Sequence, residues 1–129
     1  MKNLHLGVSV LCLLPLAASY GVAHDYLMPL LFDFDITTVD QAHIMRSTMG
    51  LYLGMAFLWI LGMLVPTMWY TATISNVVFM FGLGSGQLLS FLIDGMPDSN
   101  LMIIYFEVET ALAIWGFFNL KRYYDPDAP

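Results

Sequence analysis

Four long runs of apolar residues dominate the chain, and most polar residues gather in the segments between them. The runs cover residues 4–23, 44–65, 68–93 and 101–120. Each reaches the roughly 20 residues that a helix rising about 1.5 Å per residue needs to cross a hydrocarbon core about 30 Å thick. None alternates with the period of two that a membrane strand requires, so the pattern predicts four transmembrane helices.

The first run also has features of a secretory signal peptide. Lys2 precedes it, and small residues occupy positions 17–19 near its end. A signal core usually holds 7–15 apolar residues and this run is longer, so we expect a retained helix, with a cleaved signal as the alternative. Pro15 predicts a bend or a break in the second half of this helix.

The distribution of charge predicts the orientation of the four helices. Lys2 precedes the first run and Lys121 and Arg122 follow the last, whereas segments 24–43 and 94–98 are acidic. Because Lys and Arg favour the cytoplasmic side, both termini are expected to be cytoplasmic. The predicted fold is all-α: one integral membrane domain over residues 1–129, an antiparallel up-down four-helix bundle with an outer loop at 24–43.

The composition excludes several classes of protein. Only 11% of the residues are charged and 59% are hydrophobic, whereas a soluble domain carries roughly 25% charged residues. The 4 Lys and Arg against 10 Asp and Glu exclude a nucleic-acid-binding protein, so the bilayer is the expected environment. No catalytic or nucleotide-binding motif is found, and the acids and histidines of the outer loop match no zinc or calcium pattern. We therefore predict no cofactor and no metal, and no enzymatic activity is supported.

Two parts of the outer loop carry structural signals. Residues 26–32 are too apolar for a solvated loop and too few to cross the bilayer. They are expected to lie in the membrane interface or to fold against the bundle. Residues 37–40 hold threonine and aspartate, which are typical helix N-caps, before the second long helix. The second connection, at Pro66, predicts a tight hairpin.

Small residues indicate helix faces that allow close approach. Gly50 and Gly54 form one Gly-x-x-x-Gly step, and Gly82 and Gly86 form another. Such steps are common where membrane helices pack closely. Lipid provides no hydrophobic driving force for helix association, so the helices depend on close van der Waals packing at small residues. We predict that these four glycines pack helices within the chain. The alternatives are a dimer face and a site of close approach to a ligand.

Ionisable groups inside the apolar runs predict a polar cluster. A charge at the centre of the bilayer costs about 2.5–3.5 kcal/mol on insertion scales, so such groups are expected to meet. Arg46, Asp94 and Glu107 fall in the same outer half of the predicted bundle, and Gln87 shares a helix face with Asp94. These four residues are predicted to form the cluster, with His43 at its rim.

Two interpretations of the cluster stay open. It either locks helix register by ion pairs and hydrogen bonds, or it serves proton transfer through Glu107 or head-group binding through Arg46. Glu109 points about 200° away from Glu107 on the same helix. The two acids cannot both face one site, so one of them must find another partner, extend outward to the interface or carry a proton.

Three motifs resemble a known family. They are residues 44–54, residues 78–90 and residues 94–97, followed by Glu107 in the last helix. Together they resemble the small bacterial membrane family catalogued as domain of unknown function 4345, over about residues 20–120. The resemblance implies a four-helix bundle of the bacterial inner membrane without an established activity, and it directs attention to Arg46, Asp94 and Glu107. Family members commonly carry arginine where this chain has Gln87. This difference removes one positive charge from the predicted cluster and weakens the hypothesis that the cluster binds an anion.

Two functions are compatible with these features. The first expectation is a non-enzymatic accessory or structural subunit that packs against a membrane complex or against a second copy of itself. The alternative is a lipid or small-molecule carrier, with proton coupling as an option, that uses the outer polar cluster.

Overall fold

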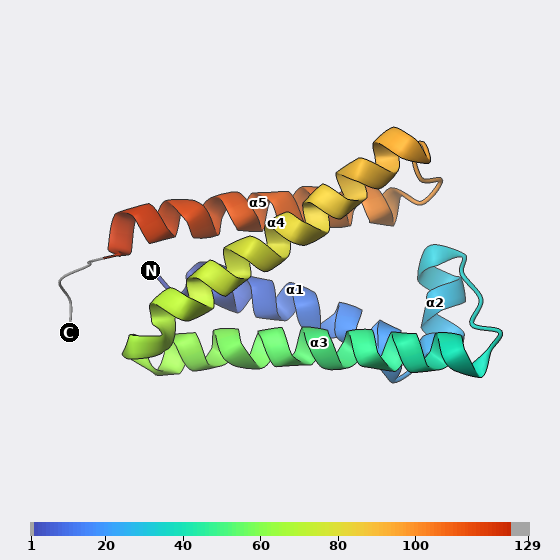
Figure 1. Ribbon diagram of the computed structural model, residues 1–129, viewed down its shortest axis with the longest axis horizontal. Helices are drawn as coiled ribbons and strands as arrows, with labels where there is room; N and C mark the ends of the chain where they lie inside the picture. The colour runs from blue at the N-terminus through green and yellow to red at the C-terminus, as the bar shows by residue number, and fades with distance from the viewer. Residues whose placement is uncertain (1, 125–129) are drawn as a thin grey trace.

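The computed structural model describes residues 2–124, which form five α-helices and no strand (Figure 1). Met1 and residues 125–129 of the predicted domain lie outside the described residues. Four helices are long and apolar enough to cross a membrane, which confirms the predicted all-α membrane fold. They are α1 (Leu4–Gly21), α3 (Val39–Leu64), α4 (Trp69–Ile93) and α5 (Asn100–Tyr123). The fifth, α2 (His24–Phe32), is too short to cross.

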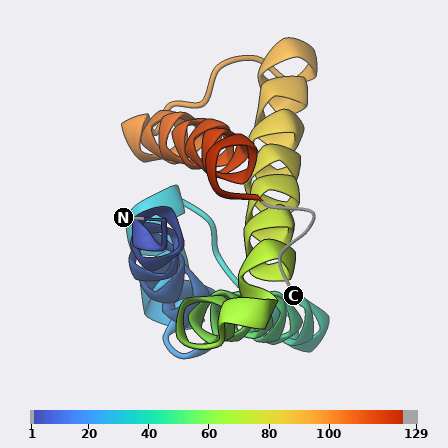
Figure 2. The ribbon, with the colours of Figure 1, turned by 90° about the vertical axis from the view of Figure 1, so that its left-hand side faces the viewer.

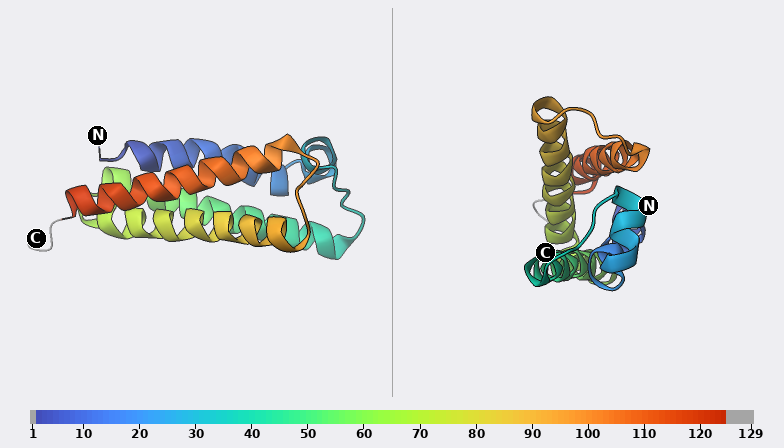
Figure 3. Two further views of the ribbon diagram at one scale, coloured as in Figure 1. Left: turned by 90° about the horizontal axis from the view of Figure 1, so that it is seen from above. Right: turned by 90° about the vertical axis from the view of Figure 1, so that its right-hand side faces the viewer.

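The four long helices run up and down in turn (Figures 1 and 3). The start of α1, the α3–α4 connection and the end of α5 lie at one end of the bundle, here called the hairpin end. Helix α2 and the α4–α5 connection lie at the other, here called the α2 end. The order of the helices therefore places the first and last described residues on the same side.

Local sequence signals explain where α3 begins and ends. Thr38 and Gln41 form a capping box, in which the Gln41 N–H donates to Thr38 Oγ1 at 3.2 Å and the Thr38 N–H donates to Gln41 Oε1 at 3.0 Å. The cap starts the helix at Val39 and not at residue 44, because polar residues outside the apolar run still propagate a capped helix. At the other end, Pro66 opens a short 3₁₀ turn (Pro66–Met68) that completes the predicted hairpin.

Two further expectations for the N-terminal half have clear outcomes. Of the bend or break predicted at Pro15, the break is absent: α1 continues through this position, because proline removes a single backbone donor and the turns on either side remain helical. The apolar segment of the outer loop folds against the bundle as α2, with His24 and Met28 buried. Phe32, at its end, packs against Tyr105 of α5 with ring centroids 6.1 Å apart.

The helices form two closely packed pairs, α1 with α3 and α4 with α5. Helix α4 leaves α3 at the hairpin and crosses toward α5, so the pairs diverge at the α2 end (Figures 1 and 2). At the hairpin end, Trp59 Nε1 donates to Ser75 Oγ at 3.1 Å and ties α3 to α4. The buried core contains Leu6, Val10, Leu13, Leu16, Ala17, Tyr52, Ala56, Trp59, Trp69, Ala72, Met80, Leu112 and Ala113.

The glycines that pack helices within the chain are not the predicted ones. A Cβ added at Gly62 would overlap the Cβ of Ala72 on α4, and one at Gly116 would lie 2.7 Å from Val77 Cγ2. In contrast, a Cβ at any of the four predicted glycines would meet nothing within 4 Å; they are Gly50, Gly54, Gly82 and Gly86. The prediction of packing within the chain was wrong for these four, because the helices turn other small residues toward each other.

We therefore expect Gly62→Ala to lower the thermal stability of the detergent-purified protein, by about 1–3 kcal/mol for a methyl group forced into a filled contact. Both overlapping Cβ atoms are fixed to helix backbones, so α3 and α4 must separate to admit the new group. The matched control is Gly54→Ala, which should leave stability unchanged or slightly raised because alanine favours helix more than glycine does. Equal losses in the two variants would contradict this account of the packing.

Candidate functional site

A cavity of about 330 Å³ lies where the two helix pairs diverge. Every helix of the bundle contributes to its wall, and we call it the Glu109 cavity after its ionisable residue. Its lining residues are Leu16, Tyr20, Phe32, Tyr52, Gly82, Leu83, Gly86, Gln87, Met102, Tyr105 and Glu109. The second Gly-x-x-x-Gly step thus borders open space, where the missing side chains of Gly82 and Gly86 leave room.

Glu109 is the buried acid of this cavity. It is the tenth residue of the 24-residue helix α5 and is only 5% exposed. Gln87 Nε2 donates a hydrogen bond to Glu109 Oε2 at 3.0 Å, which joins α4 to α5 across the cavity wall. This bond leaves Gln87 Oε1 buried without a hydrogen-bond partner. The cavity therefore has one polar pole, made of a carboxyl group and an amide oxygen.

Glu109 has no positive partner within residues 2–124, where the one close contact between a basic and an acidic side chain joins His24 Nδ1 to Asp25 Oδ1 at 3.3 Å. Lys2, Lys121 and Arg122 belong to the hairpin end of the bundle. Burying an acid without a counter-charge is costly, and an ionisable residue inside a membrane helix is by default a candidate for function. Glu109 is accordingly the first candidate functional residue.

Aromatic rings form much of the remaining wall. Tyr20 packs edge-to-face on Tyr52 with centroids 5.4 Å apart, and Tyr52 packs in the same way on Phe79 at the same distance. Phe32 and Tyr105 close the side nearest α2. These contacts hold the rings in fixed positions, so the cavity combines rigid apolar walls with a single acidic pole.

A second cavity of about 520 Å³ lies next to the first, toward the α2 end. The two share the side chains of Tyr20, Phe32 and Met102. Asp33 and Asp98 also line this outer space, and both residues are exposed. We call it the vestibule, because it adjoins the Glu109 cavity on the side of the α2 end.

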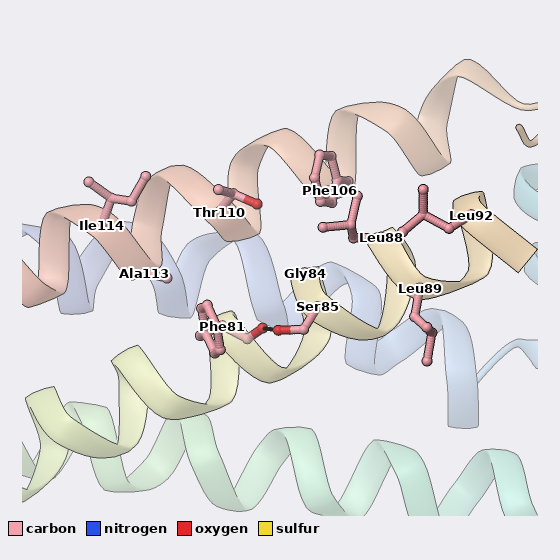
Figure 4. Close-up of a pocket in the computed structure, with 10 residues that line it drawn as sticks. All are labelled: Phe81, Gly84, Ser85, Leu88, Leu89, Leu92, Phe106, Thr110, Ala113 and Ile114. Carbon is pink, nitrogen blue, oxygen red and sulfur yellow. Dashed lines mark hydrogen bonds between the residues drawn. The ribbon is translucent and has the colours of Figure 1, made fainter.

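The groove between α4 and α5 on the surface of the bundle has a different character (Figure 4). It measures about 440 Å³, and Leu88, Leu92 and Phe106 are among the apolar side chains that line it. Its polar side chains are Ser85, whose hydroxyl donates to the Phe81 carbonyl oxygen, and Thr110. None of the described residues that line this groove is ionisable.

The polar cluster predicted from the sequence is not assembled. Of its members only Gln87 borders the buried acid, whereas Arg46, Asp94, Glu107 and His43 are all exposed. None of these four forms an ion pair within the part of the chain that the structure describes. The predicted partnership of Arg46 with Glu107 was therefore wrong.

Helix rotation explains why the cluster does not form. The buried face of α5 runs through Glu109, Ala113 and Gly116, so Glu107 points away from the bundle. On α3 the buried face contains Tyr52 and Trp59, which turns Arg46 outward with the exposed Gly50 and Gly54. Asp94, at the C-terminal end of α4, accepts a hydrogen bond from Ser90 Oγ at 2.8 Å.

The structure also reveals a buried polar group at the hairpin end that sequence reasoning missed. Asn119 Nδ2 lies 2.8 Å from His5 Nδ1, and His5, Ser9 and Asn76 are each completely buried. The signal available in the sequence was polar residues inside apolar runs, with His5 and Ser9 four residues apart on one helix face.

For Glu109 the signal was its spacing to Ala113 and Gly116, which places the acid on the same helix face as these two small residues.

Comparison with known proteins gives one match. The sequence model of a family described as Domain of unknown function (DUF4345) matches residues 1–120. No curated protein and no solved structure matches the chain. The match confirms the resemblance inferred from the three motifs.

A double-mutant cycle tests the Gln87–Glu109 contact. Gln87→Leu removes the donor from a buried carboxyl and Glu109→Leu removes the acceptor, so their effects on unfolding free energy in detergent should be coupled by about 0.5–3 kcal/mol. The cycle of Arg46→Ala with Glu107→Ala should be additive within about 0.5 kcal/mol, because these residues share no contact. Coupling between Arg46 and Glu107, with additive effects of Gln87 and Glu109, would contradict this arrangement and support the cluster predicted from the sequence.

Proposed function

The chain belongs to the DUF4345 family, and we propose that it is a non-enzymatic protein of the bacterial inner membrane that binds a small amphipathic molecule in the Glu109 cavity. The observation that carries the proposal is Glu109 itself: an acid 5% exposed, in the middle of a spanning helix, bordering a cavity and lacking a positive partner within residues 2–124. Such a group is costly to bury, and an ionisable residue inside a membrane helix is therefore by default a candidate for function.

The cavity has the size and lining of a ligand site. Small-molecule pockets usually measure about 300–1,000 Å³ and combine apolar and aromatic walls with a few placed polar groups. The Glu109 cavity measures about 330 Å³, and Gln87 and Glu109 supply its acidic pole. Gly82 and Gly86 support the interpretation of close approach to a ligand, since larger residues there would fill the space.

A second candidate function is that of an accessory subunit. Gly50 and Gly54 lie on an exposed face of α3, and a Cβ added at either would meet nothing within 4 Å in the described chain. A face of small residues lets another membrane helix approach closely. This favours packing against a larger membrane complex or a second copy, and it is compatible with ligand binding because the face lies outside the Glu109 cavity.

Ligand binding can be measured by isothermal titration calorimetry in dodecyl maltoside, with protein-free micelles as blank. The probes are 2-phenylethylamine and 2-phenylethanol, each a single ring with one polar group. At least one should bind saturably, and Gly82→Leu should weaken that binding about tenfold or more by filling the cavity. Gly54→Leu makes the same substitution on the exposed face of α3 and should leave the affinity unchanged. Absence of saturable binding, or equal effects of the two substitutions, would refute the proposal.

The same proposal places the α2 end outside and both termini in the cytoplasm, because the basic residues flank the first and last helices. In a Cys12→Ala background, Asp98→Cys should react with a membrane-impermeant maleimide in intact cells. Lys121→Cys should react only after the cells are permeabilised. Labelling of both positions in intact cells, or of Lys121→Cys alone, would overturn the orientation.

A further inference from the structure

We infer that the Glu109 cavity takes an organic cation: an ammonium group carried on an aromatic or apolar body, which reaches the cavity through the vestibule. The inference rests on the proposed function and adds the chemical class of the ligand and its route. Three independent features of the site support it: the balance of hydrogen-bond donors and acceptors, the arrangement of the rings and the charge along the route.

The acidic pole of the cavity calls for hydrogen-bond donors. Gln87 uses its Nε2 group on Glu109 Oε2, and its Oε1 atom is buried without a partner. Glu109 as a carboxylate offers acceptors alone, and tyrosine hydroxyls serve as either donor or acceptor. A ligand that satisfies this pole must bring N–H or O–H groups, and an ammonium brings up to three together with the missing positive charge.

The ring arrangement suits the same ligand. Tyr20, Tyr52 and Tyr105 all line the cavity that Glu109 borders. The face of an aromatic ring attracts a cation within about 6 Å of its centroid, most strongly where water is excluded. Because Tyr20 and Tyr52 are locked edge-to-face at 5.4 Å, the walls also offer a preformed surface to the apolar body of the ligand.

The route to the cavity is acidic as well. Asp33 and Asp98 line the vestibule and are exposed, and no lysine, arginine or histidine among residues 2–124 lines either the vestibule or the cavity. Asp33 is held in place at the C-terminal end of α2, where its N–H donates to the Pro29 carbonyl oxygen at 3.1 Å. Acids along a concave surface raise the local concentration of cations and repel anions.

Competing ligand classes fit less well. An anion would meet two vestibule acids and then Glu109, with no positive side chain lining the path. A neutral alcohol would supply a single donor, which serves either Gln87 Oε1 or the second carboxylate oxygen of Glu109 but not both. Only a cation both supplies donors and offsets the buried charge, so charge and not ring size should decide the affinity.

The test compares three probes that share one ring at pH 7.5: 2-phenylethylamine, 2-phenylethanol and 3-phenylpropionate. Calorimetry on the unchanged protein in dodecyl maltoside should give an affinity for the amine about tenfold or more above that for the alcohol. The propionate should bind more weakly than the alcohol. Glu109→Gln should remove the preference for the amine, while binding of the alcohol reports that the variant is folded.

The matched control is Glu107→Gln, which makes the same change two residues away on the exposed face of α5 and should leave the preference intact. A second variant, Asp33→Asn with Asp98→Asn, should slow association of the amine and weaken its dependence on salt. If the alcohol binds as tightly as the amine, or the preference survives Glu109→Gln, the cation inference fails while ligand binding stands. If neither the amine nor the alcohol binds, the proposed function itself fails.

Discussion

Close contacts at small residues set the course of α4, and the shape of the molecule depends on that course. Near the hairpin, Gly62 of α3 admits Ala72 of α4. Further along, Gly116 of α5 leaves room for Val77. A Cβ added at Gly84 of α4 would lie only 3.1 Å from Thr110 Oγ1 on α5. Because membrane helices associate through packing and not through hiding apolar surface, these contacts decide which helix α4 follows. Helix α4 therefore changes partners along its length and leaves α3 at the α2 end (Figure 2).

The cavity is a consequence of this change of partner. Where α4 diverges from α3, the space between the helix pairs is lined by rings from α1 and α3 and by Gln87 and Glu109. The stripe of α5 that approaches α4 through Gly116 also carries Glu109, so the helix cannot pack closely without burying the acid. The hydrogen bond from Gln87 offsets part of that cost, and the rest is the physical basis for expecting a ligand.

Features encoded locally could be predicted from the sequence. The four spans, the hairpin at Pro66 and a cap within residues 37–40 depend on neighbouring residues, and all three are found in the structure, the cap at Thr38. The rotation of each helix about its axis depends on which small faces meet, and the chain offers more such faces than the bundle uses. On α3, the face that carries Gly50 and Gly54 competes with the face that carries Gly62, and a prediction based on the first face turns Arg46 inward. The corresponding mistake on α5 places Glu107 inside the bundle in place of Glu109. The choice depends on contacts between distant segments, which spacing along one helix does not reveal.

The arrangement of polar groups along the bundle favours binding over conduction. Glu109 and the buried pair of His5 and Asn119 lie on one seam, about 15 Å apart along α5 by helix rise. Between them Leu13, Met80 and Leu112 are each no more than 4% exposed and fill the seam with apolar side chains. A hydrated path for ions or protons would need polar groups or water through this layer, and burying a charge there is expensive. This apolar layer thus separates the Glu109 cavity from the polar group at the hairpin end, and a bound molecule cannot pass through the layer unless the two helix pairs move.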